Sequence, residues 1–79
     1  MVDRAEQLLL DLGFHQLRVR IHGTIARIEL IPEEFPRFMQ EEIRLKVNEE
    51  FRKIGFSYTA LDILGYRTGS MNETLDIQK

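Results

Sequence analysis

The chain has 79 residues, of which 43% are hydrophobic and 30% are charged, and its formal net charge is −2. This composition predicts one globular domain over residues 1–79 and gives no general attraction to nucleic acid. The absence of cysteine excludes disulfides and thiolate chemistry, and because no apolar run reaches about 18 residues, we expect a cytoplasmic protein without membrane contact.

The N-terminal region predicts a short amphipathic helix, with Asp3 placed to cap it and Gly13 placed to end it. Its apolar residues follow the spacing i, i+3, i+4, i+7, and they are Ala5, Leu8, Leu9 and Leu12. One face of this helix is therefore expected to pack on a core.

Two strands are predicted next, over residues 17–21 and 25–30, because apolar and polar residues alternate there. Gly23-Thr24 suits the two-residue turn of a hairpin. The resulting register pairs Leu17 with Leu30, Val19 with Ile28 and Ile21 with Ala26 on one face, and Arg18 with Glu29 and Arg20 with Arg27 on the other. One face is thus apolar and the other charged.

A long helix is predicted after Pro32 and Pro36, which each suit a first helical position, and it ends at Gly55. Its apolar stripe consists of Phe35, Met39, Ile43, Val47, Phe51 and Ile54. Residues 56–63 are rich in aromatic and β-branched residues and predict a third strand. Because both faces of this strand are largely apolar, a central place in the sheet is favoured.

The predicted order is α-β-β-α-β, which indicates a small α+β domain. We expect a mixed three-stranded sheet with two helices on one face, because each helix has one apolar side to bury. This arrangement resembles a ferredoxin-like fold that lacks its first strand.

The charged hairpin face is the first candidate site. Arg18 and Arg20 alternate with apolar residues and are joined across the hairpin by Arg27, so aligned guanidinium groups can hold a phosphate or carboxylate. The alternative is an ordinary solvated sheet face, which the pattern alone favours.

The loop at residues 65–72 is the second candidate. Two glycines free its backbone to direct amides at an anion, and Arg67, Ser70 and Asn72 add side-chain donors. The alternative is a connecting loop without a ligand, because glycine, serine and asparagine are common in turns.

Catalytic and metal chemistry find little support in the sequence. Glu29 and Asp62 are expected to pair with nearby arginines, and His15 and His22 are too separated for a zinc site without cysteines. Nothing places a histidine beside Ser57 or Ser70 as a general base. We therefore predict no catalytic residue and no metal ligand.

Four segments together resemble a known family: LRVRIHG at 17–23, ARIEL at 26–30, GF at 55–56 and LDILGYRTGSMN at 61–72. In this order they are similar to the C-terminal part of the ATP-dependent sacrificial sulfur transferases. These enzymes belong to the PP-loop ATP pyrophosphatase superfamily and act in the biosynthesis of the nickel-pincer nucleotide cofactor. The resemblance runs from about Ala5 to Leu75.

The resemblance implies a non-catalytic C-terminal module that binds the phosphate of a pyridinium mononucleotide through Arg18, Arg20, Arg67 and, more weakly, Ser70. The family's ATP-binding loop and sulfur-donating cysteine precede the matched region, so no cofactor is expected in this chain. ATP and Mg²⁺ are expected with an N-terminal PP-loop domain, fused or separate, and the module is expected to support a homo-oligomer. The alternative is a protein–protein interaction module without a small-molecule ligand.

Overall fold

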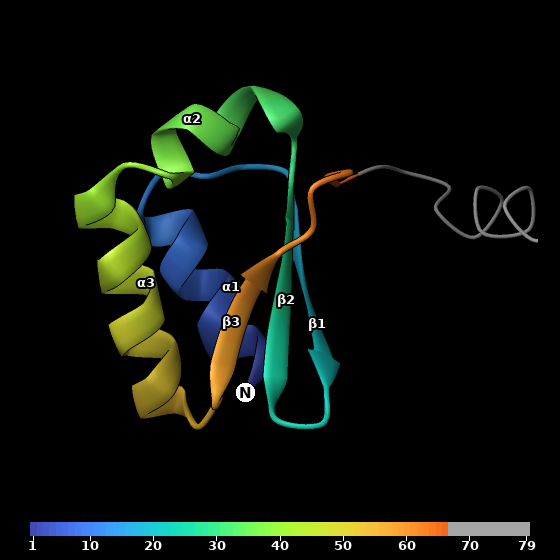
Figure 1. The fold of residues 1–79 in the computed structure, drawn as a ribbon, viewed down its shortest axis with the longest axis vertical. Helices are drawn as coiled ribbons and strands as arrows, with labels where there is room; N and C mark the ends of the chain where they lie inside the picture. Colours follow the sequence, from blue (N-terminus) through green and yellow to red (C-terminus); the bar gives the residue numbers. More distant parts are fainter. Residues whose placement is uncertain (67–79) are drawn as a thin grey trace, which may run out of the picture.

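A hairpin of two antiparallel strands, β1 (Leu17–His22) and β2 (Ile25–Leu30), is the local unit on which the fold is built. Their register pairs Leu17 with Leu30 and His22 with Ile25, as the alternation predicted. Gly23 has a φ of 62° in the connecting turn, a conformation that glycine adopts without strain. The third strand, β3 (Tyr58–Leu61), runs parallel to β2 and completes a three-stranded sheet in the order β1-β2-β3 (Figure 1).

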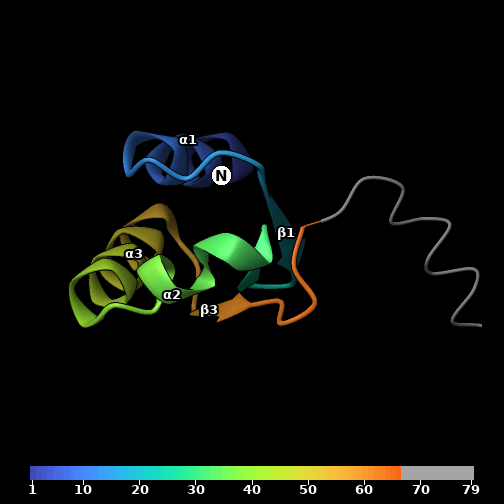
Figure 2. The same ribbon diagram turned by 90° about the horizontal axis from the view of Figure 1, so that it is seen from above.

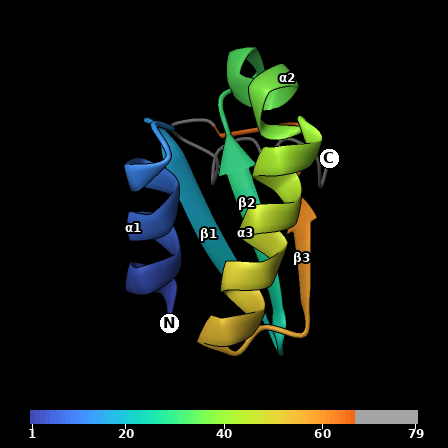
Figure 3. The same cartoon turned by 90° about the vertical axis from the view of Figure 1, so that its left-hand side faces the viewer.

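Two helices cover one face of this sheet, as Figures 2 and 3 show. They are α1 (Val2–Asp11) and α3 (Glu41–Ile54). Between β2 and α3 the chain forms a 3₁₀ turn, η1 (Pro32–Glu34), and a short helix, α2 (Phe35–Phe38), at one end of the domain. The structure describes residues 1–66, and in them the predicted α-β-β-α-β class is confirmed.

The core lies between the helical layer and the sheet. It is formed by the inward residues of β1 and β2, the apolar side of each helix and the residues just after α1 and α3. Its buried members are Ala5, Leu9, Phe14, Leu17, Val19, Ala26, Ile28, Leu30, Phe38, Val47, Phe51 and Phe56. Among residues 1–66, no helix lies over the opposite face of the sheet (Figures 2 and 3), and we call it the open face.

The predicted long helix is wrong at its start, because the chain forms two helices that are separated at Met39 and Gln40. Gln40 has extended angles, with a φ of −59° and a ψ of 138°. The break lets Phe38 enter the core, where its ring lies 5.7 Å from that of Phe14 in an edge-on contact. Met39, which the stripe placed inward, is 53% exposed instead. The free energy gained by burying the Phe38 ring outweighs the loss of a continuous helix.

Two further predictions need correction. β3 is an edge strand and not a central one, and it spans four residues, with Tyr58 69% exposed. Its apolar composition therefore does not reflect burial on both faces. Asp3 lies in the first turn of α1 and is not its cap, since the cap position belongs to Met1. Within residues 1–66, no helix has both the length and the apolar character needed to cross a membrane.

Candidate anion-binding site

Arg18 and Arg20 both project from the open face, because residues of a strand alternate between its two sides. Leu17 and Val19, which alternate with them along the strand, are buried in the core, whereas both arginines are exposed. The hairpin register sets Arg18 opposite Glu29 and Arg20 opposite Arg27. The paired strands therefore bring Arg18, Arg20 and Arg27 to one face of the sheet, as the alternation predicted.

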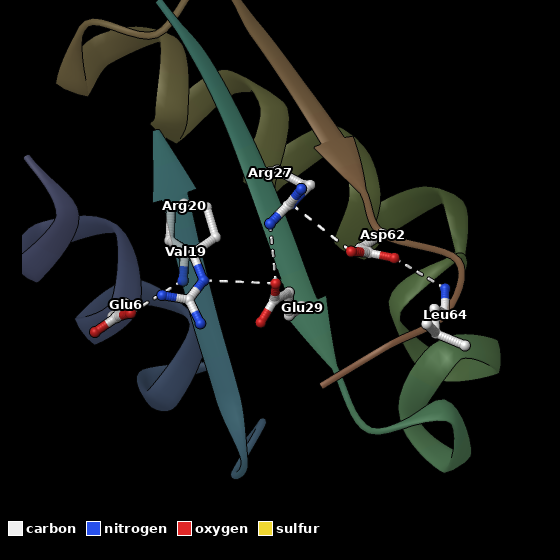
Figure 4. A network of polar contacts seen from close by, with 7 residues as sticks. All are labelled: Glu6, Val19, Arg20, Arg27, Glu29, Asp62 and Leu64. Carbon is white, nitrogen blue, oxygen red and sulfur yellow. Dashed lines mark hydrogen bonds and ion pairs between the residues drawn. The ribbon is translucent and has the colours of Figure 1, made fainter. Parts of the chain in front are cut away.

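Glu29 organises the centre of the open face. Glu29 is 4% exposed, and within residues 1–66 it is the only charged residue that is buried. One carboxylate oxygen, Oε2, lies 3.1 Å from a terminal nitrogen of Arg27 and 3.5 Å from Nε of Arg20 (Figure 4). A buried carboxylate needs such partners, because an unpaired buried charge strongly destabilises a fold.

Arg27 is held between two acids. Its terminal nitrogen donates a hydrogen bond to Glu29, and its Nε lies 3.7 Å from Oδ2 of Asp62 on the other side. The second distance fits an ion pair but is too long for a hydrogen bond, and within residues 1–66 this buried Nε has no hydrogen-bond partner. The prediction that Glu29 and Asp62 pair with arginines is confirmed.

The three arginines differ in how many donors remain for a ligand. Arg27 is engaged by two carboxylates. Arg20 is engaged through Nε alone, and its side chain is 44% exposed. Arg18 is exposed and makes no side-chain ion pair or hydrogen bond in the described part of the chain. An external anion therefore finds its freest donors on β1.

At the start of the second candidate site, the backbone amides donate hydrogen bonds within the protein. The amide of Leu64 donates to Oδ1 of Asp62, that of Gly65 to the Asp62 carbonyl, and that of Tyr66 to the Leu30 carbonyl at 2.7 Å. These amides are consequently not directed at a ligand. Gly65 instead lets the backbone pass close to β2, because a Cβ at this position would lie 2.8 Å from the Leu30 carbonyl oxygen.

Several predicted residues lie away from the site or outside the described chain. Arg67, Ser70 and Asn72 fall outside residues 1–66. His15 does not belong to the site: its Nδ1 lies 3.6 Å from the Glu34 carboxylate, at the α2 end of the domain. Residues 1–66 contain no group of three or more histidine, aspartate or glutamate side chains arranged to hold a metal ion.

The sequence analysis missed a cavity of about 390 Å³ between α3 and β3. Its lining is mainly apolar, with Arg44, Asn48 and Thr59 as polar members, and the hydroxyl of Thr59 is buried without a hydrogen-bond partner in residues 1–66. Leu45 lines it and is 51% exposed. The only sequence signal was an apolar Leu45 beside the predicted stripe.

The chain is similar in sequence to two longer proteins, whereas no family model matches it. It is 42% identical over 74 residues, or 94% of its length, to an uncharacterised protein of Synechocystis. It is 45% identical over 71 residues, or 90% of its length, to the pyridinium-3,5-bisthiocarboxylic acid mononucleotide synthase of Lactiplantibacillus plantarum. The chain spans 28% and 25% of these two proteins. The resemblance drawn from the sequence motifs is confirmed.

Proposed function

Because the chain is homologous to about a quarter of a pyridinium-3,5-bisthiocarboxylic acid mononucleotide synthase, we propose that it is the non-catalytic C-terminal domain of an ATP-dependent sulfur transferase. In this proposal the domain binds the phosphate of a pyridinium mononucleotide through Arg18, Arg20, Arg67 and Ser70. ATP and Mg²⁺ bind to a PP-loop domain, fused or separate, and the C-terminal domain supports assembly of a homo-oligomer.

The observation that supports the proposal is that Arg18 and Arg20 lie on the same face of one strand. Each guanidinium has five N–H donors in a planar fork that suits phosphate oxygens. Within the described chain all N–H donors of Arg18 are available, whereas Nε of Arg20 is already paired with the Glu29 carboxylate. Two such forks on the same face can hold several oxygens of one phosphate.

The position of the chain after β3 supports the addition of Arg67. Tyr66 donates its amide to the Leu30 carbonyl, and Leu30 pairs with Leu17, the neighbour of Arg18. The residue that precedes Arg67 is thus attached at the Arg18 end of the hairpin. Arg67 and Ser70 lie outside the described residues, and their assignment to the same site rests on the family resemblance, with which this position of Tyr66 agrees.

A titration with inorganic phosphate and then nicotinic acid mononucleotide, followed by amide NMR shifts of the 79-residue chain, tests the proposal. We expect shifts around Arg18 and Arg20 that weaken as salt is added, because exposed ion pairs are screened. Arg18→Ala removes the shifts, and Arg52→Ala on α3 is the matched control that retains them. Wild-type protein without clustered shifts at millimolar ligand contradicts the proposal.

A second function is supported by a separate observation. The cavity between α3 and β3 adjoins β3, an edge strand whose four residues carry no charge or proline to discourage pairing. A protein–protein interaction module without a small-molecule ligand uses such a surface. In that case self-association measured by analytical ultracentrifugation is unchanged by Arg18→Ala and reduced by Leu45→Glu.

A further inference from the structure

The acids on the open face limit what kind of anion the arginines can accept. We propose that Glu29 and Asp62 restrict the site to a single phosphate group and select against polyphosphates such as pyrophosphate. This inference rests on the proposed function, because it concerns the specificity of the same site.

The charges of the open face nearly balance. Three guanidinium groups, those of Arg18, Arg20 and Arg27, lie with the two carboxylates of Glu29 and Asp62, which leaves one net positive charge among these five residues. A phosphate monoester carries about −1.5 to −2 at neutral pH. Arg67, which the proposed function adds to the site, raises the sum to two. One phosphate group still neutralises it, and a second group meets no uncompensated cation among these residues.

The placement of the charges makes the restriction directional. The donors that remain available belong to Arg18 and Arg20 on β1. Glu29 lies on β2 and Asp62 directly follows β3, and both are drawn with Arg20 in Figure 4. An anion on β1 that extends across the sheet consequently approaches carboxylates. The edge of the site toward β2 repels additional negative charge.

Glu29 cannot easily move out of the way of a ligand. Its side chain is 6% exposed, and Arg27 and Arg20 both engage its Oε2. Arg27 is itself held on its other side by Asp62. Because the carboxylate is fixed by its neighbours, it acts as a permanent repulsive element, which is how many binding sites reject a competitor.

Removing either negative charge should affect the two anions unequally. Coulomb repulsion grows with the charge of the ligand, so a more highly charged pyrophosphate benefits more than phosphate does. Asp62→Asn retains the oxygen that accepts the Leu64 amide, and Glu29→Gln retains the shape of the buried side chain. Both changes neutralise the acid with little change in volume.

The test is the ratio of the dissociation constants for inorganic phosphate and pyrophosphate, measured by NMR titration of the full chain. We expect wild-type protein to bind inorganic phosphate at least as tightly as pyrophosphate, and we expect Asp62→Asn and Glu29→Gln to shift the ratio by about threefold or more toward pyrophosphate. Glu41→Gln on α3 changes the net charge equally on the opposite layer and should leave the ratio unchanged. Amide spectra establish that each variant is folded, and Asp62→Asn remains decisive if the buried Glu29→Gln variant unfolds.

The possible failures can be distinguished. If wild-type protein binds neither anion, the proposed function fails and this inference with it. If wild-type protein binds pyrophosphate more tightly than phosphate, or if Asp62→Asn changes the ratio no more than Glu41→Gln does, the inference on Glu29 and Asp62 is overturned while the anion site stands.

Discussion

The carboxylate of Glu6 accepts a hydrogen bond from the backbone amide of Val19 at 2.9 Å. Glu6 belongs to α1, and Val19 lies in β1, which is an edge strand of the sheet. The helix thus occupies a donor that an edge strand would otherwise present to another chain. The contact also ties the N-terminal helix to the strand that carries Arg18 and Arg20.

We expect Glu6→Ala to lower the free energy of unfolding by about 1.5 kcal/mol, because a partly buried amide loses a charged acceptor. Urea unfolding followed by circular dichroism measures the change. Glu6→Gln keeps an acceptor oxygen and should lose less. Equal stability of the alanine variant and wild type contradicts a structural role for this contact.

Gly65→Ala should destabilise the domain by about 2 kcal/mol or more, since it combines a left-handed backbone with a steric clash. Gly65 has a φ of 95°, and its added Cβ would lie 2.8 Å from the Leu30 carbonyl oxygen. Gly23→Ala is the matched control, because Gly23 has a φ of 62° but nothing within 4 Å of an added Cβ. Thermal unfolding should rank Gly65→Ala as the more damaging change, and the reverse order would refute the clash.

Phe51→Ala should destabilise the domain by about 3–5 kcal/mol through lost burial and a cavity. The Phe51 side chain is fully buried, and its ring centroid lies 5.7 Å from that of Phe56. For so small a domain this loss is expected to abolish the cooperative urea transition at ambient temperature. Leu45→Ala, on the exposed side of the same helix, should change stability by less than about 1 kcal/mol.

Arg37→Met should lower the free energy of unfolding by about 1–2 kcal/mol. Its guanidinium lies 3.9 Å from the centroid of the Phe14 ring and donates a hydrogen bond of 2.9 Å to the Leu12 carbonyl. These contacts join α2 to the segment between α1 and β1. Arg52→Met, at an exposed position of α3, is the control, and chemical denaturation of both variants compares them. Similar losses in both would show that the Phe14 and Leu12 contacts add nothing.

The hairpin could be predicted from the sequence because a strand has a period of two, and a turn at Gly23 leaves one register in which every inward pair is apolar. The break at Gln40 could not, because nothing local forbids a helix there. It depends on Phe38 reaching Phe14, a contact between residues far apart in the chain. The edge position of β3 likewise depends on which strand it pairs with, and not on its composition.

The site was predictable to the same extent. Alternation alone placed Arg18 and Arg20 on one face, and the hairpin register aligned them with Glu29 and Arg27. Two features depended on tertiary structure: the burial of Glu29, and the ion pair of Arg27 with Asp62, which directly follows β3 and lies 35 residues later in the chain. The availability of donors, and hence the selectivity that we propose, follows from those two features.

The parallel pairing of β2 with β3 has a consequence for how the domain folds and opens. β1 and β2 are joined by a two-residue turn, whereas β3 can pair with β2 only after the chain from Ile31 to Ser57 has turned back. Pairing across a longer loop loses more chain entropy. The hairpin should therefore form early and β3 late, and in native-state hydrogen exchange the amides of β3 should exchange before those that join β1 to β2.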